Sequence, residues 1–107
     1  LDFLYKQLGS TQADLVLCDA MESLVRCLSR IERDRISGKV LRMISTASEL
    51  ESVAARIGLP LLEKIARSVR LTAKHQDMPG MAAACARLSR VGNQSIAAFW
   101  NPHGLSG

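Results

Sequence analysis

The sequence has little that would build a sheet or a core of aromatic rings. Aromatic residues make up 4% of the 107 residues, and there are only three prolines. A core poor in aromatic rings must be built from Leu, Ile, Val, Met and Ala, a set that suits helices packed on helices. No stretch alternates apolar and polar residues over a convincing strand length. The chain has the length of one domain, and these shortages indicate an all-α domain.

The sequence also lacks long apolar runs and cysteines spaced for a metal. No 18 consecutive apolar residues occur, so no membrane span is expected, and no basic segment leads into an apolar stretch as in a signal peptide. Cys18, Cys27 and Cys85 form an odd set without CxxC spacing. Free thiols in a reducing compartment are therefore expected. Together these features predict a cytoplasmic protein that does not bind a membrane.

Helical periodicity runs through almost the whole chain, and turn residues divide it into segments. Apolar residues recur every three or four positions from Leu17 onward, which is the pattern of amphipathic helices. Ser37-Gly38, Gly58 and Pro79-Gly80 interrupt the pattern. The predicted helices are, in order, residues 11–36, 39–56, 60–75 and 81–99. Four such helices with short links predict an antiparallel four-helix bundle.

The two ends of the chain are predicted to lie outside the four long helices. Residues 1–10 are expected to form a short helix that is closed by Gly9 and acts as a lid on the bundle. Ser10 or Thr11 offers an N-cap for the first long helix. Residues 101–107 are expected to be a loose tail. The whole chain is thus predicted to be a single domain.

Each predicted long helix has an apolar stripe that should face the core. In the first and fourth helices the stripes are Leu17, Met21, Leu24, Leu28 and Ile31, and Met81, Ala84, Leu88, Val91, Ile96 and Phe99. In the second helix the stripe is Val40 or Leu41, then Ile44, Ala47, Leu50, Ala54 and Ile57. In the third helix it is Leu62, Ile65, Ala66, Val69 and Leu71.

The sequence has almost none of the residue patterns that carry catalysis. His75 and His103 have no Cys or carboxylate at ligand spacing. None of the GxGxxG, GxxxxGK[ST], HExxH and GxSxG motifs occurs. Glu49 and Glu51 are two residues apart, so on a helix their carboxylates diverge. We therefore expect no catalytic residue, no metal site and no cofactor, and we expect that the protein is not an enzyme.

One segment of the second helix carries a more specific pattern. Residues 48–59 read Ser-Glu-Leu-Glu-Ser-Val-Ala-Ala-Arg-Ile-Gly-Leu, and a Leu-rich helix follows. This resembles the signature of histidine-containing phosphotransfer (HPt) domains, roughly His-x-Leu-Lys-Gly-Ser-Ala-x-x-Leu-Gly-Ala. Leu50, Ala54, Ile57 and Gly58 fall where the family has Leu, Ala, a large aliphatic residue and Gly. In helix order and length the resemblance extends over residues 11–99.

The departures from that signature concern the reactive position itself. Ser48 stands where the family has its phosphorylated histidine, Glu51 where it has Lys, and Ser52 where it has Gly. A serine phosphate ester does not exchange its phosphoryl group as a phosphohistidine does, and no neighbouring residue in the sequence would activate the Ser48 hydroxyl. The resemblance implies a degenerate member of the family that retains docking without phosphotransfer.

The helix geometry places a row of polar residues opposite the apolar stripe. With Leu50 and Ala54 turned inward, Ser48 and its neighbours three and four positions away fall on the solvent side. Small side chains there would let a partner approach closely. The predicted partner-binding residues are Arg42, Ser45, Ser48, Glu49, Ser52 and Arg56. The alternative is that these residues form an ordinary solvated surface.

The partner that the resemblance implies is a receiver domain of a response regulator, or a histidine kinase, in a two-component signalling pathway. The chain has 14 Lys and Arg against 10 Asp and Glu, a net charge of +4, which favours an acidic partner surface such as a receiver's phosphoacceptor pocket. Two alternatives remain, an active phosphotransferase that uses His75 and a basic helical module that binds nucleic acid or itself. The mixture of Arg, Asp and Glu at residues 30–35 argues against nucleic acid, as does the lack of a recognition helix.

Overall fold

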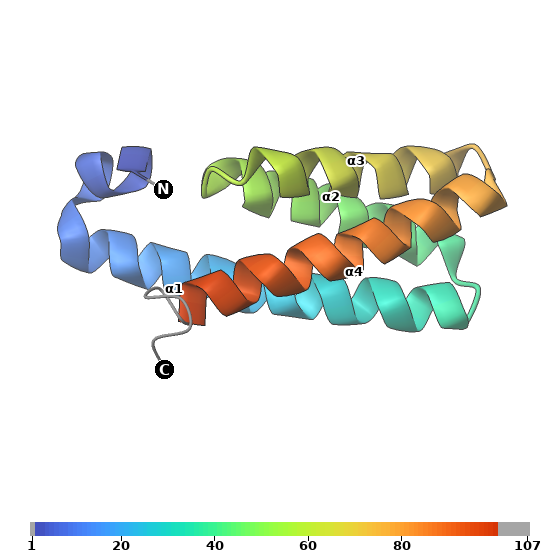
Figure 1. The fold of residues 1–107 in the computed structure, drawn as a ribbon, viewed down its shortest axis with the longest axis horizontal. Helices are drawn as coiled ribbons and strands as arrows, with labels where there is room; N and C mark the ends of the chain where they lie inside the picture. The colour runs from blue at the N-terminus through green and yellow to red at the C-terminus, as the bar shows by residue number, and fades with distance from the viewer. Residues whose placement is uncertain (1, 101–107) are drawn as a thin grey trace.

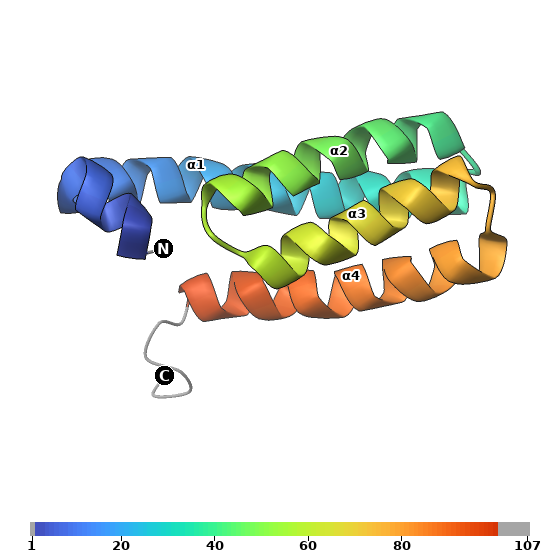
Figure 2. The same cartoon turned by 90° about the horizontal axis from the view of Figure 1, so that it is seen from above.

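The protein consists of four helices packed against one another. The computed structural model describes the backbone of residues 2–100 and the side chains of residues 12–100. The helices are α1 (Asp2–Ile36), α2 (Val40–Arg56), α3 (Pro60–Lys74) and α4 (Met78–Trp100), and residues 2–100 contain no strand. The helices lie side by side, and the turns between them fall alternately at the two ends of the bundle (Figures 1 and 2). This confirms the all-helical fold with four packed helices; the predicted tail at residues 101–107 lies outside the described residues.

The start of α1 differs from the sequence prediction. The helix runs without interruption from Asp2 to Ile36, so Gly9 does not close a separate short helix and neither Ser10 nor Thr11 begins a new one. A glycine inside a helix costs only about 1 kcal/mol relative to Ala, which is too little to end a helix that has no proline or competing turn nearby. The first turns nevertheless bend away from the axis of the rest of α1 (Figure 1).

The three turns between helices share one hydrogen-bond pattern. After α1, the N–H of Gly38 donates to the carbonyl of Arg35 and that of Lys39 to the carbonyl of Asp34. The same pair of bonds closes α2 at Gly58 and α3 at Gln76. This is the Schellman motif, which needs a left-handed residue just after the helix. Gly38 and Gly58 have φ of 71° and 76°, and Gln76 takes the same role with φ of 56°.

The turn between α3 and α4 uses Asp77 for two purposes. Its N–H donates to the carbonyl of Thr72 to complete the end of α3. Its carboxylate then accepts a hydrogen bond from the N–H of Gly80 (3.1 Å) in the first turn of α4. The preceding residue, Pro79, has no N–H that would need an acceptor. One residue thus ends one helix and caps the next, which keeps the connection short.

The core is built from the apolar stripes, with one residue misassigned by the sequence analysis. Leu50 and Ala54 are fully buried. Of the two residues predicted for the first position of the α2 stripe, Val40 packs against the core and Leu41 is 82% exposed. Leu71 is exposed, so its assignment to the core is wrong. Met43 and Ala73 are buried instead. Residues two positions apart point about 200° apart on a helix. Leu41 and Leu71 therefore face away from the core that their neighbours enter.

An ion-pair cluster joins α2 to α3 beside this core. The carboxylate of Glu51 accepts hydrogen bonds from Arg67 Nε (3.3 Å) and from Nη2 of Arg70 (3.2 Å), and it also pairs with Arg70 Nε. Arg67 also contacts Glu63. Glu51, which departs from the HPt signature, thus has a structural role between two helices.

None of the described helices is both long and apolar enough to cross a membrane.

Candidate interaction face

The predicted partner-binding residues all lie on exposed positions of α2. Ser48 is exposed at the middle of the helix, while Leu50 and Ala54 on the other side are fully buried. The orientation inferred from the sequence is therefore correct. The exposed positions are those of Arg42, Ser45, Ser48, Glu49, Ser52 and Arg56. We call this set the α2 face.

The α2 face is a long row and not a compact cluster. Arg42 and Arg56 are 14 positions apart on one helix, which corresponds to about 21 Å along its axis. The Ser52 hydroxyl donates to the main-chain carbonyl of Ser48 (3.4 Å), so it is tied to its own helix. No ion pair among the described residues engages Arg42 or Arg56. Both guanidinium groups are thus available to an acidic surface.

Glu49 has a partner that sequence analysis could not identify. The Cys27 thiol of α1 donates a weak hydrogen bond to Glu49 Oε2, with the two atoms 3.6 Å apart. Burial of Cys27, followed by the negative charge of Glu49 and that hydrogen bond, raises the pKa of the thiol from 9.0 to about 11. Cys27 is therefore a protonated, unreactive thiol at neutral pH. Its contact with the carboxylate of Glu49 lies at the boundary between α1 and α2.

Arginines of α1 extend the α2 face, and the sequence analysis missed them. Arg26 and Arg30 both act electrostatically on Cys27 in the direction that lowers its pKa, so they lie close to the boundary where Glu49 meets α1. Arg26 and Arg56 also line one surface hollow, together with Asp19 and Glu22. The spacing of the arginines in α1 was visible in the sequence, but their position beside α2 depends on how the two helices pack.

The Ser48 hydroxyl has no hydrogen-bonded base among the described side chains. No described hydrogen bond links Ser48 Oγ to a His, Asp or Lys side chain. His75 is an exposed residue at the C-cap of α3, outside any helix centre, and His103 lies outside the described residues. Within the described residues, no three His, Cys, Asp or Glu side chains are grouped so that they could hold a metal ion.

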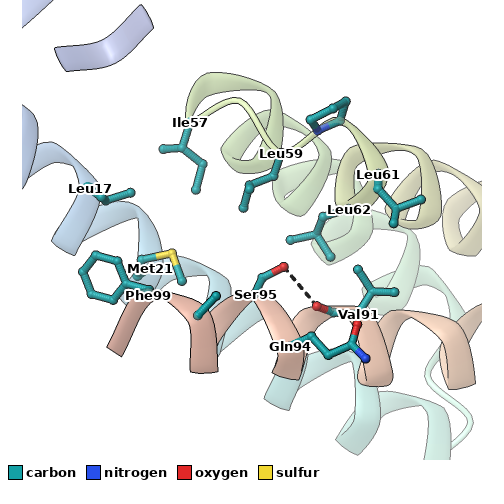
Figure 3. A pocket seen from close by; sticks show the side chains of 12 residues that line it. Leu17, Met21, Ile57, Leu59, Leu61, Leu62, Val91, Gln94, Ser95 and Phe99 are labelled. Atoms are coloured by element: carbon teal, nitrogen blue, oxygen red, sulfur yellow. Dashed lines mark hydrogen bonds between the residues drawn. The ribbon is translucent and has the colours of Figure 1, made fainter. Parts of the chain in front are cut away.

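A second feature, an apolar pocket, was not predicted at all. It has a volume of about 440 Å³ and lies at the end of the bundle where the α2–α3 turn meets α1 and the last turns of α4. Figure 3 shows Leu17 and Met21 of α1 facing Leu59 and Leu62 across it, with Phe99 of α4 beside Met21. Ser95 donates to the Val91 carbonyl at 3.0 Å along one wall. The lining residues are Leu17, Met21, Ile57, Leu59, Pro60, Leu61, Leu62, Val91, Gln94, Ser95, Ala98 and Phe99.

Comparison of the chain with models of protein families, with curated proteins and with solved structures found no match.

Proposed function

We propose that the protein is a non-catalytic, HPt-like interaction module of a two-component signalling pathway, with the antiparallel bundle topology of that family. In this proposal the α2 face docks a receiver domain of a response regulator, or a histidine kinase, and does not transfer phosphate. Such partners act in the cytoplasm, which is where the proposal places the protein.

The observation that carries the proposal is the orientation of α2. The residue at the position of the family's phosphorylated histidine, Ser48, is exposed at mid-helix, and Leu50 and Ala54 are buried below it. A buried Ser48 would have removed the resemblance. Small exposed side chains on either side, at Ser45 and Ser52, leave room for another protein's loop to approach the helix.

The charge of the face supports an acidic partner. Arg42 and Arg56 mark its two ends without an internal ion pair, and Arg26 and Arg30 of α1 lie along its edge. Rim charges of this kind accelerate encounter with an oppositely charged surface and make it sensitive to salt. The acidic phosphoacceptor pocket of a receiver domain is complementary to such a row.

A charge-reversal experiment with a matched control tests the docking. Purified receiver domains are titrated with the wild-type protein, with the double variant Arg42→Glu/Arg56→Glu, and with Arg87→Glu/Arg90→Glu. The control changes two exposed arginines of α4 and alters the net charge equally. We expect the α2 variant to bind a cognate receiver at least about tenfold more weakly, mainly through slower association, and the α4 variant to bind like the wild type.

Three results would contradict the proposal. If both double variants lose affinity equally, the attraction is non-specific. If no receiver or kinase domain binds, the docking assignment is wrong. If phosphorylated receivers transfer acid-labile phosphate to the wild type but not to His75→Ala, the protein is an active phosphotransferase.

A further inference from the structure

The walls of the apolar pocket are held in place by contacts outside it. At the turn between α2 and α3, the N–H of Leu59 donates to the carbonyl of Ala54 (2.9 Å) around the left-handed Gly58. Along α4, the helix comes so close to α1 at Gly92 that an added Cβ would lie 2.6 Å from Leu28 Cδ1. Between these contacts and the end of the bundle, the protein encloses about 440 Å³. The pocket is therefore a preformed space, with a volume in the range of sites that hold small molecules.

The lining of the pocket is apolar. Leu17 and Met21 of α1 face Leu59 and Leu62 across it, and Phe99 lies beside Met21 (Figure 3). None of the described residues that line it is charged. Water in such a cavity finds few hydrogen-bonding partners, so apolar cavities stay dry and take up small apolar molecules. An apolar molecule also gains dispersion contacts that the lining side chains lack across empty space.

Several of the lining side chains have apolar surface left to bury. Leu59, Val91 and Phe99 pack against the core but are only partly buried, and Leu61 is 52% exposed. The free energy gained by covering apolar surface grows with the area that is removed from water. A molecule seated in the pocket would cover these side chains together.

Two polar side chains among the described lining residues restrict the chemistry of that molecule. The Ser95 hydroxyl already donates to the carbonyl of Val91 (3.0 Å). The Gln94 amide makes no side-chain hydrogen bond to a described residue, and it offers both a donor and an acceptor. It can thus pair with one polar group. A charged group would lose its hydration without meeting a counter-charge in the lining.

We propose that the pocket is a binding site for an uncharged, largely apolar small molecule with one hydrogen-bonding group. The apolar part lies between Leu17, Leu62 and Phe99, and the polar group pairs with the Gln94 amide. None of the residues of the α2 face lines the pocket. The site is therefore independent of the docking proposal, and the failure of either proposal leaves the other untouched.

Three probes with the same alkyl chain and different head groups test the site. The wild-type protein is titrated at neutral pH with 1-octanol, with octanoate and with octylammonium, and binding is measured by calorimetry. We expect 1-octanol to bind with one molecule per chain, and each charged probe to bind at least about tenfold more weakly. In amide NMR spectra, 1-octanol should shift signals of residues 91–99 and leave the middle of α2 unchanged.

A matched pair of variants on α4 locates the binding. Ala98 lines the pocket, whereas its neighbour Ala97 does not, and both are exposed. Ala98→Phe adds a ring to the pocket, and we expect it to weaken 1-octanol binding at least about tenfold. Ala97→Phe adds the same ring outside the pocket and should bind like the wild type. Far-UV circular dichroism should show that both variants remain helical.

A substitution of the exposed Gln94 tests the polar contact. Gln94→Leu keeps a side chain of similar size and removes the amide, so we expect it to bind 1-octanol several-fold more weakly. Unchanged affinity in this variant would overturn the assignment of Gln94.

The site itself is wrong if 1-octanol produces neither heat nor amide shifts, or if Ala98→Phe and Ala97→Phe bind it alike. Equal affinity for the three probes would overturn the preference for an uncharged ligand. Binding of 1-octanol that weakens as protein concentration rises, with a dimer detected by light scattering, would assign the pocket to a second copy of the chain instead.

Discussion

At the scale of single residues, two buried side chains, Leu50 and Cys27, lie directly beneath or beside the α2 face. Leu50 fixes which side of α2 enters the core. Cys27, from the neighbouring helix, contacts the carboxylate of Glu49 at 3.6 Å. A thiol is a weak donor, so this contact contributes little by itself. The contact matters through its electrostatics. A thiolate would be buried beside the negative charge of Glu49, so Cys27 must stay protonated for the native contact to persist.

The raised pKa of Cys27 predicts a loss of stability at alkaline pH. In the folded protein the thiol loses its proton near pH 11, whereas the ordinary value is 9.0. Between these values the folded state binds more protons than the unfolded state, so the free energy of unfolding falls as pH rises. We expect the wild type to lose about 2 kcal/mol more than Cys27→Ala between pH 9 and 11.

Denaturant unfolding at closely spaced pH values measures this difference. Cys18→Ser, which removes an exposed thiol, serves as the control and should follow the wild type. Parallel pH curves for the wild type and Cys27→Ala would show that the buried thiol is not linked to folding.

At the scale of elements, the close approach of α4 to α1 depends on a glycine. Gly92 is buried inside α4, and an added Cβ would lie 2.6 Å from Leu28 Cδ1. From the sequence alone, this glycine only lowers the helix propensity of the segment. The structure gives it a second role, because its missing side chain makes room for Leu28 of α1.

A double-mutant cycle separates the two roles of Gly92. Alanine at this position gains helix propensity of up to about 1 kcal/mol, but in the wild type it must displace Leu28. We expect Gly92→Ala to be neutral or destabilising alone, and stabilising by about 1 kcal/mol in the Leu28→Ala background. Equal effects in both backgrounds would mean that Leu28 moves aside without cost. Thermal or denaturant unfolding of the four proteins provides the measurement.

The elements also show what sequence periodicity can and cannot provide. It located the turns at Gly38 and Gly58 and put Leu50 on the inner side of α2, because these depend on local spacing. It left the choice between Val40 and Leu41 open, and it wrongly assigned Leu71 to the core, because an apolar residue beside a stripe looks in the sequence like part of that stripe. The sequence of one helix does not determine the orientation of that helix about its own axis relative to the helices that pack against it.

The contacts at the α2 face and at the apolar pocket could not be predicted from the sequence, for a related reason. The pairing of Cys27 with Glu49 joins residues 22 positions apart. The pocket brings together Leu17, Leu59 and Phe99 from widely separated parts of the chain. Such juxtapositions depend on the packing of whole helices, which composition and periodicity leave undetermined.

At the scale of the whole molecule, the bundle is packed unevenly along its length. The fully buried side chains of α2 and α3, such as Leu50 and Ile65, form a continuous core that the Glu51 ion pairs border. The C-terminal half of α4 instead lines a cavity, where Val91 and Phe99 are only partly buried. Local stability should follow this difference, since opening a segment costs less where it buries less apolar surface.

Native-state hydrogen exchange should therefore reveal a gradient along the molecule. We expect amides in the middle of α2 and α3 to exchange near the rate of global unfolding. Amides of residues 96–99 should exchange at least about tenfold faster through local opening. Uniform protection across α2, α3 and the end of α4 would contradict this, and would mean that the cavity does not weaken the end of the bundle.

The first turn of α1 and the last turn of α4 both lie at the end of the bundle that holds the cavity (Figures 1 and 2). A fluorescent probe in the last turn of α4 would therefore report on the cavity and not on the middle of α2. Trp100 is such a probe, because it is the only tryptophan in the chain and its ring lies edge-on, 4.7 Å from that of the cavity-lining Phe99.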